Sequence, residues 1–238
     1  MSEFIDVPLR PATLDRWLVR NRIVDALRKT LPSVNGVVLD VGCGKQPYRS
    51  LLLAPPSCAT AVFGVDIPSE RYGKHDVAWD GLQLPFGDSS VDYVLATEVL
   101  EHCAVPDVVV AEMFRVLRPG GGMFLTVPFL WPLHDTPYDE YRYTPYALER
   151  ILVGAGFDDV ALEALGGWDA SLAQLIGLWV RRRPMRATTR RILSRAALPV
   201  VRALVRRDRM PASFADGVMM TGLAGTAAKP ATRAAASP

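Results

Sequence analysis

Cysteine is scarce in this sequence, which has three among 238 residues, at Cys43, Cys58 and Cys103. An odd number of cysteines without metal-ligand spacing predicts neither a disulfide framework nor a zinc site. A chain of this kind fits a reducing compartment. We therefore expect a cytoplasmic protein.

Long apolar runs are also missing. The longest mostly apolar stretch, Ala170 to Val180, is shorter than the roughly 20 residues that a membrane-spanning helix needs. The N-terminus lacks the basic start and continuous apolar core of a signal peptide. The sequence thus predicts no stable insertion into a membrane.

Net charge is low, at +2, but it is unevenly distributed. The stretch from Arg181 to Arg209 contains eleven arginines and a single acid, Asp208, which gives it a local charge of +10 and leaves about −8 for the remainder. Half of the residues are hydrophobic, and the length suits one sizeable core. We expect a single domain over residues 1–238.

Short apolar runs alternate with helical stretches through the first two thirds of the chain. Runs at 36–42, 61–65, 91–96 and 122–127, with a further one near 156–163, are typical of buried parallel strands. The alternation predicts an α/β fold with a doubly wound, Rossmann-like sheet of seven strands, the last antiparallel. This core is expected at residues 36–168. The segment 1–35 that precedes it should contain a helix at about 13–30 with Thr13 as its N-cap.

The pattern changes after residue 168. Helices are expected at about 169–180 and 186–208, separated at Pro184 and kinked at Pro199, within an inserted basic segment spanning 169–212. The chain should then return to the sheet with a final strand at 213–224. Residues 225–238, rich in Ala, Thr and Pro, are predicted to be a disordered tail.

A glycine-rich turn follows the first predicted strand, in Val38-Leu-Asp-Val-Gly-Cys-Gly44. Gly42 and Gly44 permit a tight turn and a close approach of ligand to backbone. A dinucleotide fingerprint would place a third glycine or alanine where Pro47 stands, so this turn disfavours a nicotinamide cofactor.

An acid closes the second predicted strand. Asp66 lies 22 residues beyond Gly44, where a carboxylate can accept hydrogen bonds from both hydroxyls of a ribose. The alternative is that Asp66 only caps the following loop. The turn and the acid together favour S-adenosylmethionine (SAM), which carries no phosphate.

Four motifs in order, LDVGCG, GVD, WDGLQLPFGDSSVDYVLATEVLEH and RVLRPGGGMFLTVP, resemble the type 11 branch of class I SAM-dependent methyltransferases. The resemblance covers about residues 36–165 and implies an enzyme that transfers a methyl group from SAM. It implies that Asp40, Gly42, Cys43 and Gly44 contact the methionine end of SAM, and that Thr97 and Glu98 lie beside the methionine portion. It also implies that Asp66 and Ile67 contact the ribose and adenine, and that Asp80, Gly81 and Leu82 flank the adenine edge. A non-catalytic SAM-binding protein is the alternative.

The segment 128–144 follows the fifth predicted strand and is dense in aromatic and ionisable residues. We expect it to bind the methyl acceptor, by stacking and by hydrogen bonds to hydroxyls. The candidate acceptor contacts are Phe129, Tyr138, Tyr141, Arg142 and Tyr143, with His102 from the preceding motif.

Methylation of a hydroxyl needs a proton acceptor, and His134 is the candidate general base because an imidazole titrates near neutrality. The alternative is that His134 only fixes the loop. Asp135 and Asp139 could hold Mg²⁺ through oxygen ligands, or could form a solvated loop face paired with Arg142.

The pattern His-Asp-x-Pro-Tyr-Asp-x-Tyr-Arg-Tyr-Thr, from His134, resembles sugar and polysaccharide O-methyltransferases, including those of methylmannose polysaccharide assembly. The resemblance implies a saccharide or glycan hydroxyl as acceptor. A phenolic or quinone small molecule is the alternative. An RNA acceptor is disfavoured because no amine-flipping motif or RNA-binding module is present, and we expect no nucleic-acid partner.

The basic segment also carries an apolar stripe. Such a helix could pack on the sheet domain, form a homodimer or lie on an anionic membrane. We expect packing within the protein or a homodimer, and no salt-sensitive binding to anionic liposomes. The stripe consists of Ile192, Leu193, Ala196, Val200 and Leu204.

Overall fold

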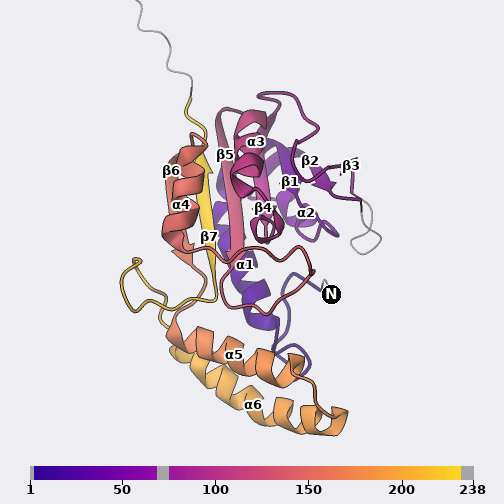
Figure 1. Cartoon of the computed structure of the whole chain (residues 1–238), viewed down its shortest axis with the longest axis vertical. Helices are drawn as coiled ribbons and strands as arrows, with labels where there is room; N and C mark the ends of the chain where they lie inside the picture. The colour runs from indigo at the N-terminus through magenta and orange to yellow at the C-terminus, as the bar shows by residue number, and fades with distance from the viewer. Residues whose placement is uncertain (1–2, 69–74, 232–238) are drawn as a thin grey trace, which may run out of the picture. The chain divides into compact units, whose positions relative to one another are not determined.

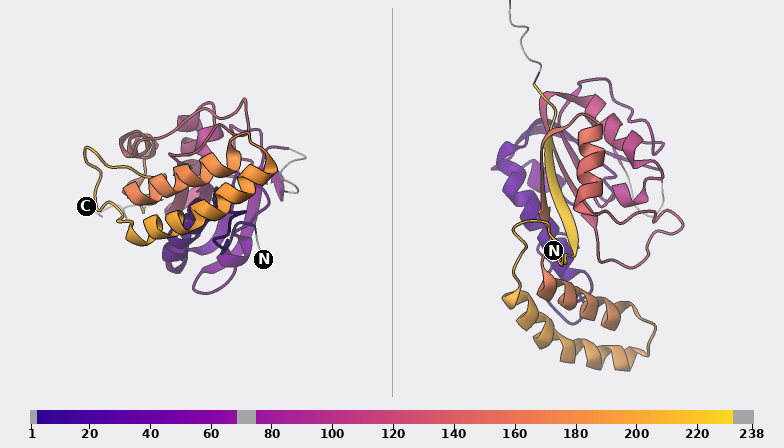
Figure 2. Two further views of the ribbon diagram at one scale, coloured as in Figure 1. Left: turned by 90° about the horizontal axis from the view of Figure 1, so that it is seen from below. Right: turned by 60° about the vertical axis from the view of Figure 1, so that its left-hand side comes forward.

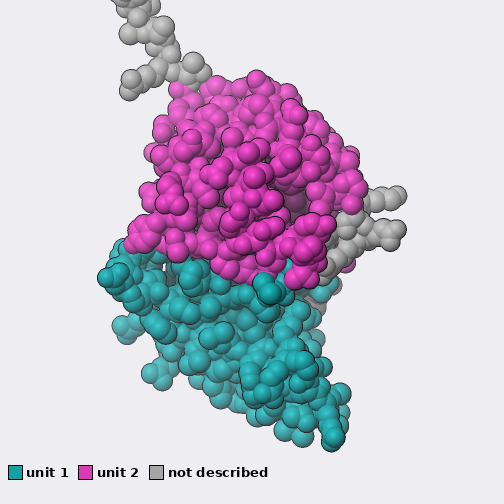
Figure 3. Space-filling view, viewed as in Figure 1, with its two compact units in different colours: residues 1–28, 128–134, 163–224 teal, residues 29–127, 135–162, 225–238 magenta. Residues whose placement is uncertain are grey.

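The computed structural model describes residues 3–68 and 75–231. The chain divides into two compact units, which Figure 3 distinguishes by colour. Unit 1 comprises residues 1–28, 128–134 and 163–224, and unit 2 comprises residues 29–127, 135–162 and 225–238. The single domain predicted for the chain stays a prediction.

The strands are β1 (Asn35–Val41), β2 (Cys58–Asp66), β3 (Val77–Ala78), β4 (Val91–Thr97), β5 (Leu117–Pro128), β6 (Asp158–Ala164) and β7 (Gly222–Ala228). They form one sheet in the order β3-β2-β1-β4-β5-β7-β6 (Figure 1). β1 pairs in parallel with β2 and β4, and β4 pairs in parallel with β5. At the end of β7 the N–H of Gly120 donates to the carbonyl of Lys229, and the N–H of Lys229 donates to the carbonyl of Gly121, both at 2.9 Å. This reciprocal pairing is antiparallel, and the predicted fold class is confirmed.

The helices are α1 (Trp17–Thr30), α2 (Arg49–Leu52), α3 (Pro106–Val116), α4 (Pro145–Gly154), α5 (Trp168–Arg182) and α6 (Ala187–Arg207), with short 3-10 turns η1 (Leu31–Ser33) and η2 (Leu100–His102). In unit 2, α3 and α4 lie against the same face of the sheet (Figure 2). Within the part of the chain that the structure describes, no helix is long and apolar enough to cross a membrane.

The core of unit 2 lies along its central strands. Val38 and Leu39 of β1, Leu95 of β4, and Phe124 and Leu125 of β5 are at most 1% exposed. Burial of each such side chain stabilises the fold by roughly 1.5–3 kcal/mol. The continuous apolar runs that predicted these strands reflect this burial on both faces of the sheet. The predicted strands agree with β1, β2, β4, β5 and β6 to within a few residues, apart from the longer start of β5.

The start of the first helix differs from the prediction. The helix begins at Trp17 rather than at residue 13. The hydroxyl of Thr13 accepts a hydrogen bond from Arg10 N at 3.0 Å and donates to Pro8 O at 2.6 Å. Thr13 therefore closes the turn that precedes α1, because its hydroxyl binds backbone groups upstream of the helix.

The last strand also differs from the prediction. β7 spans residues 222–228 rather than 213–224, so residues 225–228, predicted as tail, belong to the sheet. The backbone of Gly225 packs closely there, since a Cβ atom on this residue would lie 2.6 Å from the Leu162 side chain. Just beyond the strand, Lys229 Nζ donates to the carbonyl oxygens of Phe114 at 2.8 Å and Leu117 at 2.7 Å. The rest of the predicted tail, from residue 232, lies outside the described residues.

In unit 1, α5 and α6 pack side by side (Figures 1 and 2). Leu14, Ala173 and Val201 form their buried apolar contact with the N-terminal segment. Asp15 supports it through an ion pair with Arg182 Nε at 2.7 Å and a backbone carbonyl that accepts from Gln174 Nε2 at 2.8 Å. The predicted helices of the basic segment are therefore present and packed within unit 1.

The buried face of α6 coincides only in part with the stripe predicted from sequence, of which Leu204 packs against the buried cluster. Ser194 and Val201 are 1% exposed, whereas Ile192 is 66% and Val200 49% exposed. Helical spacing alone cannot identify the buried side when apolar residues lie on more than one face, and contact with α5 decides it here.

One buried carboxylate connects the ends of these helices. Asp208, which follows α6, accepts hydrogen bonds from Gly167 N at 3.1 Å and Ala170 N at 3.0 Å, at the start of α5. Its other oxygen lies 3.5 Å from Arg22 Nη2. An acid at a helix N-terminus satisfies otherwise unpaired N–H groups and stabilises the helix dipole.

Candidate cofactor and acceptor site

The glycine turn after β1 has the conformation that its sequence predicts. Gly42 has φ +62° and Gly44 has φ +52°, a region that residues with a Cβ atom rarely adopt. A Cβ atom on Gly42 would also lie 2.5 Å from a Val99 side-chain carbon. The turn is thus compact and leaves its backbone N–H groups close to the carboxyl ends of β1 and β2.

Asp66 lies at the end of β2 and fixes this turn. Its two carboxylate oxygens accept hydrogen bonds from Gly44 N at 2.7 Å and Ile67 N at 2.8 Å. The side chain thus joins the glycine turn to β2, a contact that the sequence analysis did not predict. Each oxygen keeps a second lone pair for the predicted ribose contact, which stays a prediction.

Asp40, near the end of β1, is the most unusual acid of this region. It is 1% exposed, and its Oδ2 atom accepts no hydrogen bond from the described residues. Burial, followed by the nearby negative charge of Asp66, raises the pKa of Asp40 to about 8. A buried carboxylate without a partner is costly unless a cation or a donor reaches it. Burial also raises the pKa of the adjacent Cys43 thiol to about 12, so Cys43 is protonated and unreactive near neutrality.

Asp76 supports the turn from another side and was missed by the sequence analysis. It accepts from Gly64 N at 2.8 Å and pairs with Arg49 Nη1 at 2.6 Å. The hydrogen bond from Gly64, aided by Arg49, lowers the pKa of Asp76. No motif identifies this acid, because its partner Gly64 lies 12 residues earlier in the sequence, within β2.

The residues predicted beside adenine lie after β2 and β3. Ile67 and Leu82 are exposed apolar side chains, at 43% and 48%. A Cβ atom on Gly81 would lie 3.8 Å from Ile67 Cγ2, so the two predicted segments are close together. Asp80 accepts from Leu82 N at 2.8 Å, and backbone hydrogen bonds of this kind lower its pKa. These apolar groups suit the face of a purine base, and the adenine contact stays a prediction.

Thr97 is the last residue of β4 and Glu98 follows it, and β4 is the neighbour of β1, which leads into the glycine turn. Glu98 accepts a hydrogen bond from the Thr126 hydroxyl at 2.9 Å, and it has φ +55°, a strained conformation for a residue with a side chain. Burial raises the pKa of Glu98 to about 7. Glu98, the residue after β4, is thus a second carboxyl group near the carboxyl end of that strand.

Glu101 is a functional candidate that the sequence analysis missed. It is fully buried, and neither carboxylate oxygen accepts a hydrogen bond from the described residues. Burial and the neighbouring Glu98 raise its pKa well above the usual range. His102 Nε2 lies 3.7 Å from Glu101, while its Nδ1 is 3.0 Å from the Tyr138 carbonyl. The Leu-Glu-His sequence of the third motif was the available signal, but only the structure shows that the glutamate is buried.

Arg142 and Asp139 form a bidentate ion pair, with N–O distances of 2.6 and 2.9 Å. Pairing with Asp139 raises the pKa of Arg142. An ion pair with Arg142 is the alternative to metal binding that the sequence analysis left open. Asp139, one of the two suggested Mg²⁺ ligands, takes part in this pair. The magnesium site at Asp135 and Asp139 stays a prediction.

The predicted acceptor-binding tyrosines have different settings. Tyr138 is 63% exposed, whereas Tyr141 is 39% exposed and donates to Ala104 O at 3.2 Å. Tyr143 is 4% exposed and its hydroxyl donates to Leu100 O at 2.8 Å. The predicted acceptor contact of Tyr143 is not supported, because this side chain is committed to the core beneath Tyr141, with ring centroids 5.7 Å apart.

Phe129 and His134 lie in unit 1. Phe129 N donates to Thr221 O at 3.0 Å, and the His134 ring is perpendicular to that of Trp131, with centroids 6.5 Å apart. Both residues keep their predicted roles as hypotheses, Phe129 as an acceptor contact and His134 as the general base.

Comparison with known proteins finds that residues 39–125 match the family described as methyltransferase domain. A probable S-adenosylmethionine-dependent methyltransferase of Mycolicibacterium smegmatis is 34% identical over 135 residues, which are 51% of each chain. A 27-O-demethylrifamycin SV methyltransferase of Amycolatopsis mediterranei is 34% identical over 134 residues, 49% of this chain and 48% of that one. The chain thus spans about half the length of these curated relatives.

A solved structure shares the fold. Phosphoethanolamine N-methyltransferase 2 of Haemonchus contortus, in complex with S-adenosyl-L-methionine, superposes with a TM-score of 0.56 at 16% identity, over 92% of this chain and 56% of that one. The glycine turn and Asp66, at the end of β2, lie within the matched residues 39–125. Residues 39–125 of the chain therefore resemble a methyltransferase domain, and the chain shares the fold of a SAM-dependent methyltransferase.

Proposed function

We propose that this chain is an active SAM-dependent O-methyltransferase that methylates a hydroxyl of a saccharide or glycan. The observation that carries the proposal is a group of carboxyl side chains in unit 2 at or just beyond the carboxyl ends of β1 and β4. Asp40 and Glu101 are buried with oxygens that accept no hydrogen bond from the described residues. Glu98 lies beside Glu101 and contributes to its raised pKa.

These acids fit the cofactor. SAM carries a sulfonium and an ammonium group, and a cation offsets the cost of ionising buried carboxyl groups. The glycine turn has no room for a Cβ atom at Gly42, which fits a site where a ligand approaches the backbone closely. We assign the methionine end to Asp40, the turn at Gly42–Gly44, Thr97 and Glu98, and the ribose to Asp66.

When bound, SAM supplies an electrophilic methyl group, so the protein needs to position the acceptor and to accept its proton. His134 accepts that proton in our proposal. Glu101 and His102 provide a second acid–base pair, and His102 is held by the Tyr138 carbonyl. Tyr138 and Tyr141 stack on the acceptor, and Arg142 donates hydrogen bonds to its hydroxyls.

A saccharide acceptor is supported by the mixture of exposed rings and hydrogen-bonding groups in 135–142. Tyrosine rings pack on the apolar face of a sugar, while charged groups bind its hydroxyls. The resemblance of this segment to polysaccharide O-methyltransferases points the same way. One relative is named for an O-demethylated acceptor, rifamycin, which keeps a small-molecule hydroxyl as the second candidate.

The test is a transfer assay with methyl-labelled SAM across mono- and oligosaccharides, phenols, quinones and RNA. The proposal expects label in a saccharide product and none in RNA. Label in a phenol alone would support methyltransferase activity but refute a saccharide as the acceptor. Tight SAM binding without transfer to any acceptor class would support a non-catalytic SAM-binding protein.

A further inference from the structure

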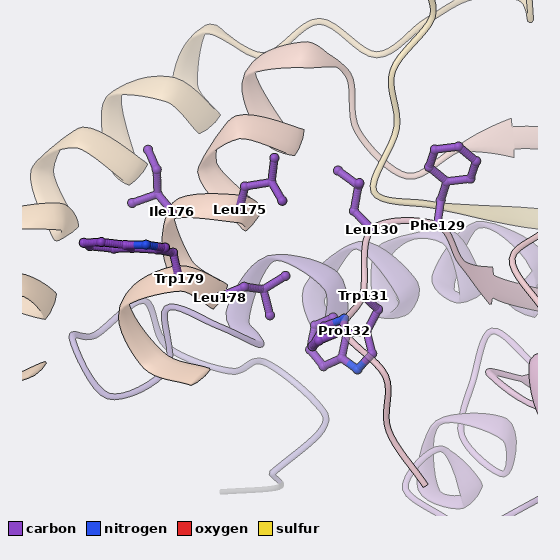
Figure 4. Close-up of a pocket in the computed structure, with 8 residues that line it drawn as sticks. All are labelled: Phe129, Leu130, Trp131, Pro132, Leu175, Ile176, Leu178 and Trp179. Carbon is purple, nitrogen blue, oxygen red and sulfur yellow. The ribbon is translucent and has the colours of Figure 1, made fainter. Parts of the chain in front are cut away.

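Unit 1 contains an apolar groove in which Phe129 is the one lining residue also predicted to contact the methyl acceptor. Its volume is about 640 Å³, and its walls are residues 129–132 and one side of α5 (Figure 4). Leu175 and Trp179 line it from α5 and remain 46% and 48% exposed, while Leu178 points toward the wall that contains Trp131. Small-molecule sites have volumes of about 300–1,000 Å³, so the groove has the size of a ligand site.

Two guanidinium groups lie over tryptophan rings of this groove. Arg183 is 4.2 Å from the centre of the Trp179 ring, and Arg182 is 5.7 Å from that of Trp131. Arg182 is also paired with Asp15, so Arg183 supplies most of the uncompensated charge. An apolar groove with cations at its rim complements a molecule that has an apolar chain and an anionic head group.

We propose that this groove binds an anionic amphiphile, with its alkyl chain between α5 and residues 129–132 and its phosphate or carboxylate head at Arg183. The apolar walls take the alkyl chain out of water, and the burial of each methylene group stabilises the complex. Guanidinium groups bind such head groups through charge-assisted hydrogen bonds.

A second copy of the chain fits this face less well. A two-fold dimer places the same surface of each copy opposite itself. Such an interface would bring together two segments that each carry eleven arginines between residues 181 and 209. Repulsion between like charges opposes that pairing, whereas the positive charge of the same arginines attracts an anionic ligand.

The probe is dodecyl phosphate, kept below its micelle concentration and titrated into the whole protein without SAM or acceptor. Trp131 and Trp179 line the groove, so tryptophan fluorescence reports binding directly, and calorimetry gives the stoichiometry. We expect one site, at least about tenfold weaker binding of dodecyl maltoside, and no binding of inorganic phosphate. Equal affinity for dodecyltrimethylammonium would overturn the assignment of the head-group site.

Two matched pairs of variants locate the ligand. Leu175→Asp should weaken dodecyl phosphate binding at least about tenfold, whereas Leu172→Asp, on the same helix and 49% exposed but not part of the groove, should change it less than twofold. Arg183→Gln should weaken dodecyl phosphate binding about fivefold or more, whereas Arg202→Gln, at an exposed residue of α6, should not weaken it. Equal effects within each pair would overturn the placement.

Two further outcomes would also overturn the proposal. One is binding to vesicles that contain phosphatidylglycerol without binding of monomeric dodecyl phosphate, which would make this face a membrane contact. The other is a stable dimer in sedimentation that Leu175→Asp dissociates and the ligand does not. Because the binding assays need no methyl transfer, a failure of the proposed enzyme activity leaves them interpretable.

Discussion

The two units differ in where their charged side chains lie, because two acids of unit 2 are buried and the arginines of α6 in unit 1 are exposed. In unit 2, Asp40 and Glu101 are buried carboxyl groups with oxygens that accept no hydrogen bond from the described residues, whereas in unit 1 the arginines of α6 are largely exposed. Exposed charges interact weakly with their surroundings because water and salt screen them, while a buried unpaired acid depends on whatever cation reaches it. The buried acids of unit 2 therefore indicate a specific ligand by themselves. The arginines of unit 1 indicate one only where they adjoin the apolar groove.

The sharpest way to separate the proposed roles is His134→Ala. If His134 is the general base, turnover falls by roughly 10²–10⁴ while SAM affinity stays nearly unchanged, since the base acts on the acceptor alone. Turnover and SAM affinity should be measured on the same preparation. A turnover within a few-fold of wild type would assign His134 a structural role and direct attention to His102, tested as His102→Ala.

Asp66→Asn tests the cofactor end of unit 2. The amide retains the shape and one acceptor for Gly44 N but removes the charge, so SAM affinity should fall at least about tenfold, the cost of a charge-assisted ribose contact. Calorimetric titration with SAM gives the change, and a thermal unfolding curve shows whether the variant is folded. A folded variant that binds SAM with near-normal affinity would exclude Asp66 from the ribose site.

The raised pKa of Asp40 predicts a pH dependence of SAM binding. Below its pKa of about 8 the free protein holds this carboxyl protonated, so a cationic ligand must displace a proton. Affinity should therefore rise with pH up to about 8, by as much as about tenfold per unit, and level off above. Asp40→Asn should flatten the profile measured between pH 6 and 9, and an unchanged slope in this variant would contradict the assignment.

The same residue affects stability without ligand. An acid whose folded pKa lies above its unfolded value makes the free energy of unfolding decrease as pH rises from about 4 to about 8. Asp40→Asn should therefore be more stable than wild type at pH 8, by several degrees in Tm, and the difference should shrink at pH 5. Calorimetric melting at both pH values measures this.

The smallest expected effect concerns the end of the sheet. Lys229→Met keeps the length of the side chain but removes its hydrogen bonds to the carbonyls of Phe114 and Leu117, and should cost about 1–3 kcal/mol of stability. Denaturant unfolding gives the value, and Lys45→Met provides a comparison at an exposed lysine of unit 2. A loss below about 0.5 kcal/mol in the first variant would show that this anchor is dispensable.

The parts of the fold that sequence predicted are those where local pattern and burial agree. The apolar runs of β1, β4 and β5 are buried on both faces, so their composition alone identifies them. The bounds of β7 could not be located this way, because the close contact of Gly225 with Leu162 is not visible in a local pattern and the same composition is common in disordered tails.

The candidate site divides in the same way. Asp66 and the glycine turn were predicted because their spacing is fixed by the strand-turn-helix unit, although the hydrogen bond between Asp66 and Gly44 was not. The buried state of Glu101 and the support from Asp76 depend on segments distant in sequence, and no local pattern encodes them. Tyr143 shows the converse error, since an aromatic residue in a polar segment can equally belong to the core.

The position of Asp208 has a consequence for the local dynamics of unit 1. Its carboxylate accepts from the first amides of α5 although it follows the end of α6, so fraying of either helix end removes support from the other. The two helices should therefore open as one cooperative unit. Amide hydrogen exchange should give both the same opening free energy, and Asp208→Asn should lower protection along α5 and α6 together while the amides of β4 keep theirs.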